Sequence, residues 1–257
     1  MAREFGGAAT DRLTVAASTP INDLNTVTVT AWIHPQTLGG GSFGRIIDKS
    51  QRLLYVASTA HIRWANARAT TTALQYTAAN SITLNTWHFL AATFSDSDTG
   101  HVYIGTLSTG GLTEATYDTN TAGAGAYTAD NATALTIGNT GAATRNFDGY
   151  IANLMMWNTV LTVGELNAVM RGSMARASAL AGWWPLWGIS APEPNWVGTG
   201  DGTVTGATRS DHPPGTGFPL MRSHRVQRLV AAAGRTTKND HFFTHGTDVG
   251  LHRWVTV

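Results

Sequence analysis

The sequence predicts an all-β fold: a sandwich of two antiparallel sheets with one short helix and an extended C-terminal arm. Three observations lead to this class. Thr, Ala and Gly are abundant, with 28 Gly in 257 residues, and Thr and Gly are typical of strands and turns. Many short segments alternate between polar and apolar residues, which is the period of a half-buried strand. Turn signals separate these segments, as expected for a sandwich or barrel.

Strand signals dominate the first 150 residues. The segment 26–33 alternates strictly, with Val27, Val29, Ala31 and Ile33 on one face. Further strands are predicted at 45–49, 53–56, 61–64, 86–94, 101–104, 135–138 and 148–157.

One later segment changes to a helical period. Thr162 and Glu165 have the spacing of a capping box, with Thr at the N-cap and Glu three residues later. Apolar residues then recur at helical spacing until Gly172. We therefore expect a short connecting helix at 163–171.

Tryptophans are concentrated in segment 181–188, which has three of them within five residues. If exposed, such rings would form a platform for sugar stacking. If buried, they would fill the core, and burial is favoured because neighbouring side chains of a strand point to opposite faces. The candidate ligand-binding residues are Trp64, Trp183 and Trp184, provided that they are exposed on the concave face of the sandwich.

The charge balance changes near residue 208, where we predict that the sandwich of residues 1–208 ends. Those residues hold 10 Lys/Arg and 13 Asp/Glu, whereas residues 209–257 hold 7 Lys/Arg and 3 Asp/Glu. The second segment is either a solvated basic tail or an arm that docks on an acidic neighbour. Its Arg and aromatic residues are the types that interfaces use, which favours docking. The candidate assembly residues are Arg222, Arg225, Arg228, Arg235, Phe242, Phe243 and Trp254.

A series of short motifs follows in a fixed order between residues 5 and 188. They include Val27-Thr-Val-Thr-Ala-Trp-Ile-His-Pro35, Ile46-Ile-Asp-Lys49, Asn85-Thr-Trp-His88, Leu135-Thr-Ile-Gly138, Phe147-Asp-Gly-Tyr-Ile151 and Gly182-Trp-Trp-Pro-Leu186. Together they resemble the laminin G-like domains of the concanavalin A-like jelly rolls. The resemblance implies two antiparallel sheets with a concave face. It also implies binding to sugars, proteins or lipids, or service as an accessory or virion module.

Some members of the family that the chain resembles are glycosidases, which use two carboxylates set close together. The chain has only four glutamates, and none lies on a strongly predicted strand with a second acid two residues away. They are Glu4, Glu114, Glu165 and Glu193. A hydrolytic triad on a nucleophile elbow is not expected either. We therefore expect no enzymatic activity and no catalytic residue.

Metal sites have little support in the sequence. The chain has no cysteine, which excludes disulfides and thiolate sites. His241 and His245 are four residues apart, but no Glu accompanies them, so we expect surface positions. The family resemblance leaves calcium as an option, and its oxygen ligands would come from Asp96, Asp98 or Asp148. The position after "Gly-x-Ile" that is commonly acidic in the family is Ala152 here, which disfavours that site. We expect no metal and no cofactor.

Two functions remain open. The first is a non-enzymatic structural or assembly protein, namely a virion surface component such as a capsid decoration, head-fibre or tail protein. Its partners would be other proteins or further copies of itself. The second is a carbohydrate- or cell-surface-binding module. No signal peptide or apolar run of about 18 residues is visible, and the basic residues are too confined to predict nucleic-acid binding. We expect a virion or extracellular surface location.

Overall fold

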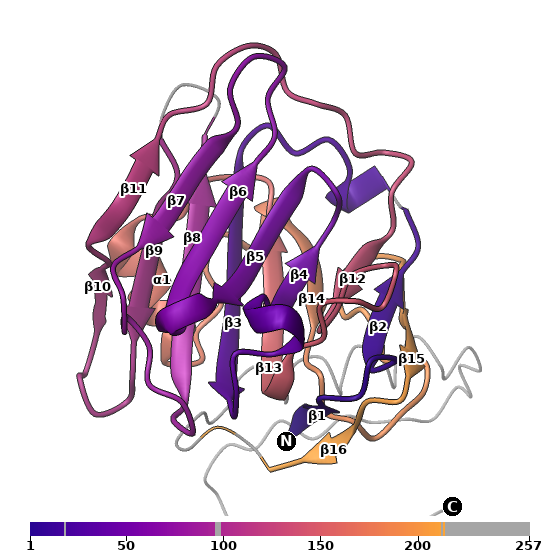
Figure 1. The fold of residues 1–257 in the computed structure, drawn as a ribbon. Helices are drawn as coiled ribbons and strands as arrows, with labels where there is room; N and C mark the ends of the chain where they lie inside the picture. Colours follow the sequence, from indigo (N-terminus) through magenta and orange to yellow (C-terminus); the bar gives the residue numbers. More distant parts are fainter. Residues whose placement is uncertain (18, 96–98, 212, 214–257) are drawn as a thin grey trace, which may run out of the picture. The chain divides into compact units, whose positions relative to one another are not determined.

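Two antiparallel sheets face each other in the computed structural model, which describes residues 1–17, 19–95, 99–211 and 213 (Figure 1). Within the described ranges, one α-helix and four short 3-10 helices connect the strands. The all-β sandwich predicted from the sequence is confirmed. Among the described residues, no helix has the length and hydropathy needed to cross a bilayer.

Sheet A contains eight strands, and strands β3 and β13 lie side by side near its centre. Its order is β10 (Leu112–Glu114), β9 (His101–Gly105), β8 (His88–Phe94), β3 (Val27–Pro35), β13 (Asp148–Trp157), β1 (Ala2–Gly6) and β16 (Thr208–Ser210), with β14 (Leu180–Trp184) also paired to β13.

Sheet B also contains eight strands and lies in front of sheet A in Figure 1. Its order is β11 (Tyr117–Thr121), β7 (Ala73–Thr77), β6 (His61–Asn66), β5 (Arg52–Ala57), β4 (Arg45–Asp48), β12 (Leu135–Ile137), β2 (Arg12–Val15) and β15 (Gly202–Thr205). The 3-10 helices are η1 (Thr19–Ile21), η2 (Gly40–Ser42), η3 (Ser58–Ala60) and η4 (Ala177–Ala179).

The apolar residues that alternate in segment 26–33 face the core, as the sequence predicts. Val27, Val29 and Ile33 are wholly buried in the core between the two sheets, because alternate side chains of β3 point to the same face. The opposite face of β3 is buried too. Trp32 points into a second apolar cluster on the outer side of sheet A and is only 1% exposed.

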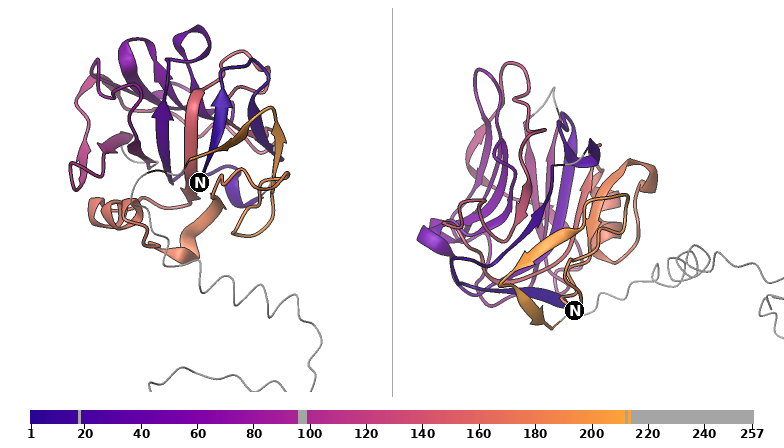
Figure 2. Two further views of the ribbon diagram at one scale, coloured as in Figure 1. Left: turned by 90° about the horizontal axis from the view of Figure 1, so that it is seen from below. Right: turned by 90° about the vertical axis from the view of Figure 1, so that its right-hand side faces the viewer.

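Helix α1 (Val163–Met170) and strand β14 supply this second cluster. Figure 2 shows α1 on the side of sheet A that faces away from sheet B. Strand β14 is paired to β13 within the sheet, and its Leu180 and Trp183 side chains join the cluster. The predicted capping box is present, since Thr162 and Glu165 cap each other's backbone N–H groups. Leu166, Val169 and Met170 are buried on the sheet. Helix α1 therefore covers part of the outer side of sheet A, whereas Trp87 and Tyr150, which also pack against this cluster, are only half-buried.

The end of the described chain is held by pairing at the edge of sheet A. Strand β16 pairs with β1, so the sheet includes Arg209 and Ser210, just past the predicted boundary at residue 208. Arg3 forms a buried ion pair with Glu193, with Nε 3.1 Å from Oε2, and this fixes the segment before β15 to β1. The predicted arm spans residues 209–257, and its part from residue 214 onward lies outside the described residues, so its docking role stays a prediction.

Gly138 provides a test of the packing between β12 and β1. Its φ is +79°, and a Cβ atom there would lie 2.2 Å from the Phe5 ring. We expect Gly138→Ala to lower the free energy of unfolding by about 3 kcal/mol, from overpacking and backbone strain. Urea unfolding measures this change in the free energy of unfolding. Gly141→Ala is the matched control, because nothing lies within 4 Å of its added Cβ. Equal stability of the two variants would contradict this packing.

Candidate functional site

Four side chains form a row across the outer side of sheet B. Arg45 on β4 pairs with Tyr55 on β5, Tyr55 pairs with Arg63 on β6, and Arg63 pairs with Tyr76 on β7. Directly paired residues on neighbouring strands point to the same face. Arg45, Tyr55, Arg63 and Tyr76 are called here the arginine–tyrosine row.

The alternation of each strand positions the row. On β5, the neighbours Leu54 and Val56 are fully buried in the core between the sheets, which turns Tyr55 outward. On β6, Ile62 and Trp64 do the same for Arg63. The row therefore follows from the same pattern that builds the core.

The two guanidinium groups of the row pack against Tyr55. The Arg45 guanidinium lies 4.0 Å from the centre of the Tyr55 ring, and that of Arg63 lies 5.6 Å from it. These are cation–π distances. Phe43 touches the same ring edge-on at 6.0 Å between centroids, and the Arg145 guanidinium lies 4.8 Å over Phe43. The row thus continues into a mixed aromatic and cationic surface.

The two arginines of the row differ in their partners. Arg45 donates from Nε to Asp48 Oδ2 over 3.1 Å, so its charge is largely matched. Arg63 has no carboxylate partner among the described residues, and its buried Nε atom has no hydrogen-bond partner there. A buried donor without a partner is unusual in native proteins and marks a place where an acceptor would be stabilised.

At β7 the row meets a histidine. The His61 ring stacks on Tyr76 with 4.2 Å between centroids and 16° between planes. Asp118 Oδ2 lies 3.6 Å from His61 Nδ1, and the Asp118 side chain is half exposed. This end of the row therefore combines a flat aromatic stack with an accessible carboxylate.

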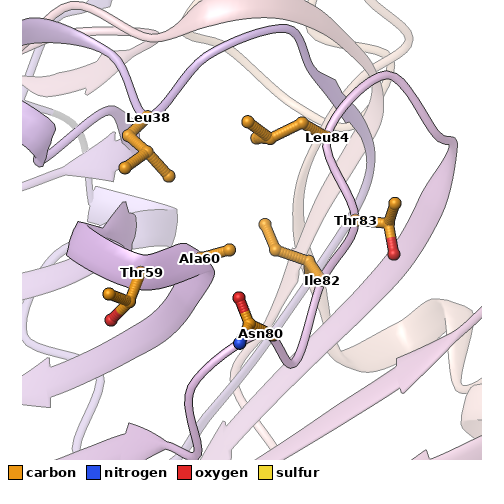
Figure 3. Close-up of a pocket in the computed structure, with 7 residues that line it drawn as sticks. All are labelled: Leu38, Thr59, Ala60, Asn80, Ile82, Thr83 and Leu84. Carbon is orange, nitrogen blue, oxygen red and sulfur yellow. The ribbon is translucent and has the colours of Figure 1, made fainter.

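A separate pocket of about 350 Å³ lies between η3 and the segment that precedes β8. Figure 3 shows Leu38, Ala60, Ile82 and Leu84 around its opening. The remaining lining residues are Thr59, Asn80 and Thr83. No charged side chain lines it, so it has few groups that could orient a polar ligand. The arginine–tyrosine row is the stronger candidate site.

The three tryptophans singled out by the sequence lie inside the protein. Trp64, Trp183 and Trp184 are 0%, 2% and 0% exposed. Each indole N–H has a structural acceptor: Thr93 O at 3.0 Å, Asn153 Oδ1 at 2.7 Å and Gly200 O at 3.0 Å, respectively. The exposure on which a sugar-stacking role depends is therefore not observed for any of them.

Other predicted site residues fall partly outside the described chain. The assembly residues Arg222, Arg225, Arg228, Arg235, Phe242, Phe243 and Trp254 lie there, as do Asp96, Asp98, His241 and His245. Asp148 is described and accepts a hydrogen bond from the Thr37 hydroxyl at 2.7 Å. Within the described residues, no three His, Asp or Glu side chains gather closely enough to hold a metal ion.

All four glutamates are in the described part of the chain, and each has a structural contact. Glu193 pairs with Arg3, Glu165 caps α1, Glu114 contacts His101 and Glu4 contacts Thr208. They belong to four different segments, so no strand carries two of them. The pair of neighbouring carboxylates that a glycosidase needs is not built from these residues.

The segment 40–44 has the residue spacing of a nucleophile elbow. Residues 40–44 read Gly-Gly-Ser-Phe-Gly, which matches the Gly-x-Ser-x-Gly pattern of the nucleophile elbow. In that elbow the serine stands between a strand and a helix. Ser42 instead ends the 3-10 helix η2 ahead of strand β4, and it has no hydrogen bond to a histidine within the described residues. The match is a turn and not an elbow.

Comparisons with known proteins agree with the fold. The family model of the concanavalin A-like lectin/glucanases superfamily matches residues 6–167. No curated protein matches the sequence.

Several solved structures are similar to this chain. A proposed carbohydrate-binding protein from Bacteroides ovatus is 17% identical, with a TM-score of 0.58 over 82% of this chain and 60% of that one. A heptameric SAP-like pentraxin from Limulus polyphemus is 15% identical (TM-score 0.43; 77% and 97% covered). Tailspike protein 2 of the Escherichia coli O157:H7 bacteriophage CAB120 is 12% identical (TM-score 0.46; 69% and 25% covered). Identities this low establish a shared fold alone, and the two TM-scores below 0.5 add nothing further.

The buried position of Trp64 predicts a role in stability and not in binding. We expect Trp64→Phe to lower the free energy of unfolding by about 1–3 kcal/mol, because it removes the hydrogen bond to Thr93 and leaves a void. Glycan binding by the folded variant should equal that of the wild type. Urea unfolding and a binding titration measure the two effects. Weaker binding at unchanged stability would show that the indole contacts the ligand.

Proposed function

Because the chain belongs to the concanavalin A-like lectin/glucanases superfamily, we propose that it is a non-enzymatic carbohydrate-binding module whose ligand lies on the arginine–tyrosine row. In more general terms, the chain is a binding or structural module of the laminin G-like type. The fold shared with the Bacteroides ovatus protein is compatible with the proposal.

One observation carries the proposal: the two sheets differ in what covers them. The outer side of sheet A is partly packed under α1, and large side chains of the sheet, those of β14 included, form an apolar cluster there. On the outer side of sheet B, Arg63 and Tyr76 stay half-buried, and neither belongs to an apolar cluster. Aromatic and arginine side chains left accessible on a sheet are the residue types that binding surfaces use.

The chemistry of the row fits a sugar ring. A pyranose has an apolar C–H face, which packs on an aromatic ring, and a rim of oxygen atoms, which accept hydrogen bonds. Tyr76 offers the ring, and the Arg63 guanidinium offers several donors in a fixed fork. The unpartnered Nε of Arg63 would gain an acceptor on binding. A carboxylate or sulfate on the sugar would strengthen that contact.

Substitution of Arg63 tests the proposal. After a glycan array has identified the best ligand, we expect Arg63→Ala to weaken its binding by roughly 10- to 100-fold, the value of a hydrogen bond to a charged group. Isothermal titration calorimetry measures the change. Arg171→Ala is the matched control, since Arg171 is exposed at the C-terminal end of α1, on the sheet A side. Equal loss in both variants, or no loss in either, would contradict a site on sheet B.

The composition of residues 209–257 supports a second candidate function. Their excess of Lys/Arg over Asp/Glu and their aromatic residues favour docking on a protein partner or on another copy of the chain. In this second proposal the chain is a virion surface component, such as a capsid decoration, head-fibre or tail protein. The sandwich would then face outward and the arm would attach it.

Truncation tests the assembly proposal. We expect the full chain to form oligomers that are visible by mass photometry, and a chain of residues 1–213 to remain a monomer with unchanged glycan binding. The arm would supply the docking contacts while the row lies on the sandwich. The same mass distribution for both chains would contradict self-assembly through the arm.

A further inference from the structure

We infer that one rim of the sandwich contains a site for a monovalent cation, and that the ammonium group of Lys49 occupies it. The site is formed by the loop after η1, by the end of β4 and by residues 130–133. It lies apart from the arginine–tyrosine row, and its chemistry does not depend on the proposed ligand.

The geometry around the Lys49 ammonium resembles the coordination of an ion. Nζ lies 2.9 Å from Asn22 Oδ1, 2.8 Å from Asp130 O, 2.9 Å from Asp130 Oδ1 and 3.1 Å from Thr133 O. An ammonium group has three N–H donors, yet four oxygens surround it. The side chains of Lys49 and Asp130 are both fully buried. The site is therefore a closed cage of oxygens.

The distances indicate which class of cation the cage fits. Calcium binds oxygen at about 2.3–2.6 Å, so the cage is too wide for calcium unless it contracts. Potassium and ammonium ions are close to each other in size, and both suit oxygens at the observed spacing. The charge of the cage is compatible with a monovalent cation. The oxygens come from one carboxylate, one amide and two main-chain carbonyls, so the cage carries a single negative charge, which Arg52 also faces.

Contacts other than Lys49 hold the cage in place. The Asp23 and Asp130 backbone N–H groups each donate to the other's carboxylate over 2.8 Å. The Tyr127 hydroxyl donates to Asp130 Oδ2 over 2.7 Å. Burial raises the pKa of Asp130. Hydrogen bonds from Asp23, Lys49 and Tyr127 lower it by more than burial raises it, so the pKa lies below its usual range. The carboxylate thus stays charged.

Arg52 gives Asp130 a second cationic neighbour. Its Nη1 lies 3.8 Å from Asp130 Oδ2, and its Nε donates to Asn66 Oδ1 over 2.9 Å. Removal of the Lys49 side chain would therefore leave the Asp130 carboxylate oriented and the oxygens in place. A free ion could then enter the position that Nζ leaves.

Cation rescue of Lys49→Ala tests the inference. In sodium buffer we expect its melting temperature to fall by about 10 °C, since a buried ion pair is broken. Replacing sodium with potassium or ammonium should recover about half of that loss, whereas the wild type should not respond to the exchange. Lys49→Met is the matched control, because its apolar side chain takes the place of the lysine side chain without a charge. This variant should lose stability, and no cation should rescue it.

The other outcomes contradict the inference. The same melting temperature for Lys49→Ala in sodium, potassium and ammonium would show that the cage holds no free cation. Rescue by calcium alone would contradict the monovalent class. If Lys49→Ala is unfolded in sodium, then recovery of its circular dichroism spectrum in potassium or ammonium supports the site, and failure in every salt overturns it.

Discussion

The pairing of β3 with β13 is the constraint on which the rest of the structure depends. Both strands send one set of side chains into the core between the sheets and the other set into a second cluster behind sheet A. Trp32 and Trp157 are buried in that second cluster, together with side chains from α1 and β14. Because packing occupies much of the outer side of sheet A, the outer side of sheet B offers the broader surface for a ligand.

The arginines of this chain differ in whether a carboxylate lies beside them. Arg3 and Arg52 are buried beside Glu193 and Asp130, and burial of a charge requires such neighbours. Arg63 lies on an open sheet with no carboxylate partner among the described residues.

Local pattern was enough to predict the fold but not the site. The strict alternation of segment 26–33 and the capping box at Thr162 depend on neighbours along the chain, and both were predicted. The row depends on strand register across four strands, and a bulge between Arg45 and Ile47 shifts that register. Composition singled out the tryptophans instead, because it cannot tell a buried indole from an exposed one. The Lys49 cage was missed for a related reason, since Asp130 is 81 residues away in sequence.

The most direct test of the central claim is an NMR titration that follows the arginine Nε–H signals of the full chain as its best glycan ligand is added. If the ligand lies on the arginine–tyrosine row, the Arg63 signal shifts saturably with the ligand, while the signals of Arg3 and Arg171 stay unchanged. Saturable shifts confined to Arg3 or Arg171, with Arg63 unaffected, would contradict the account.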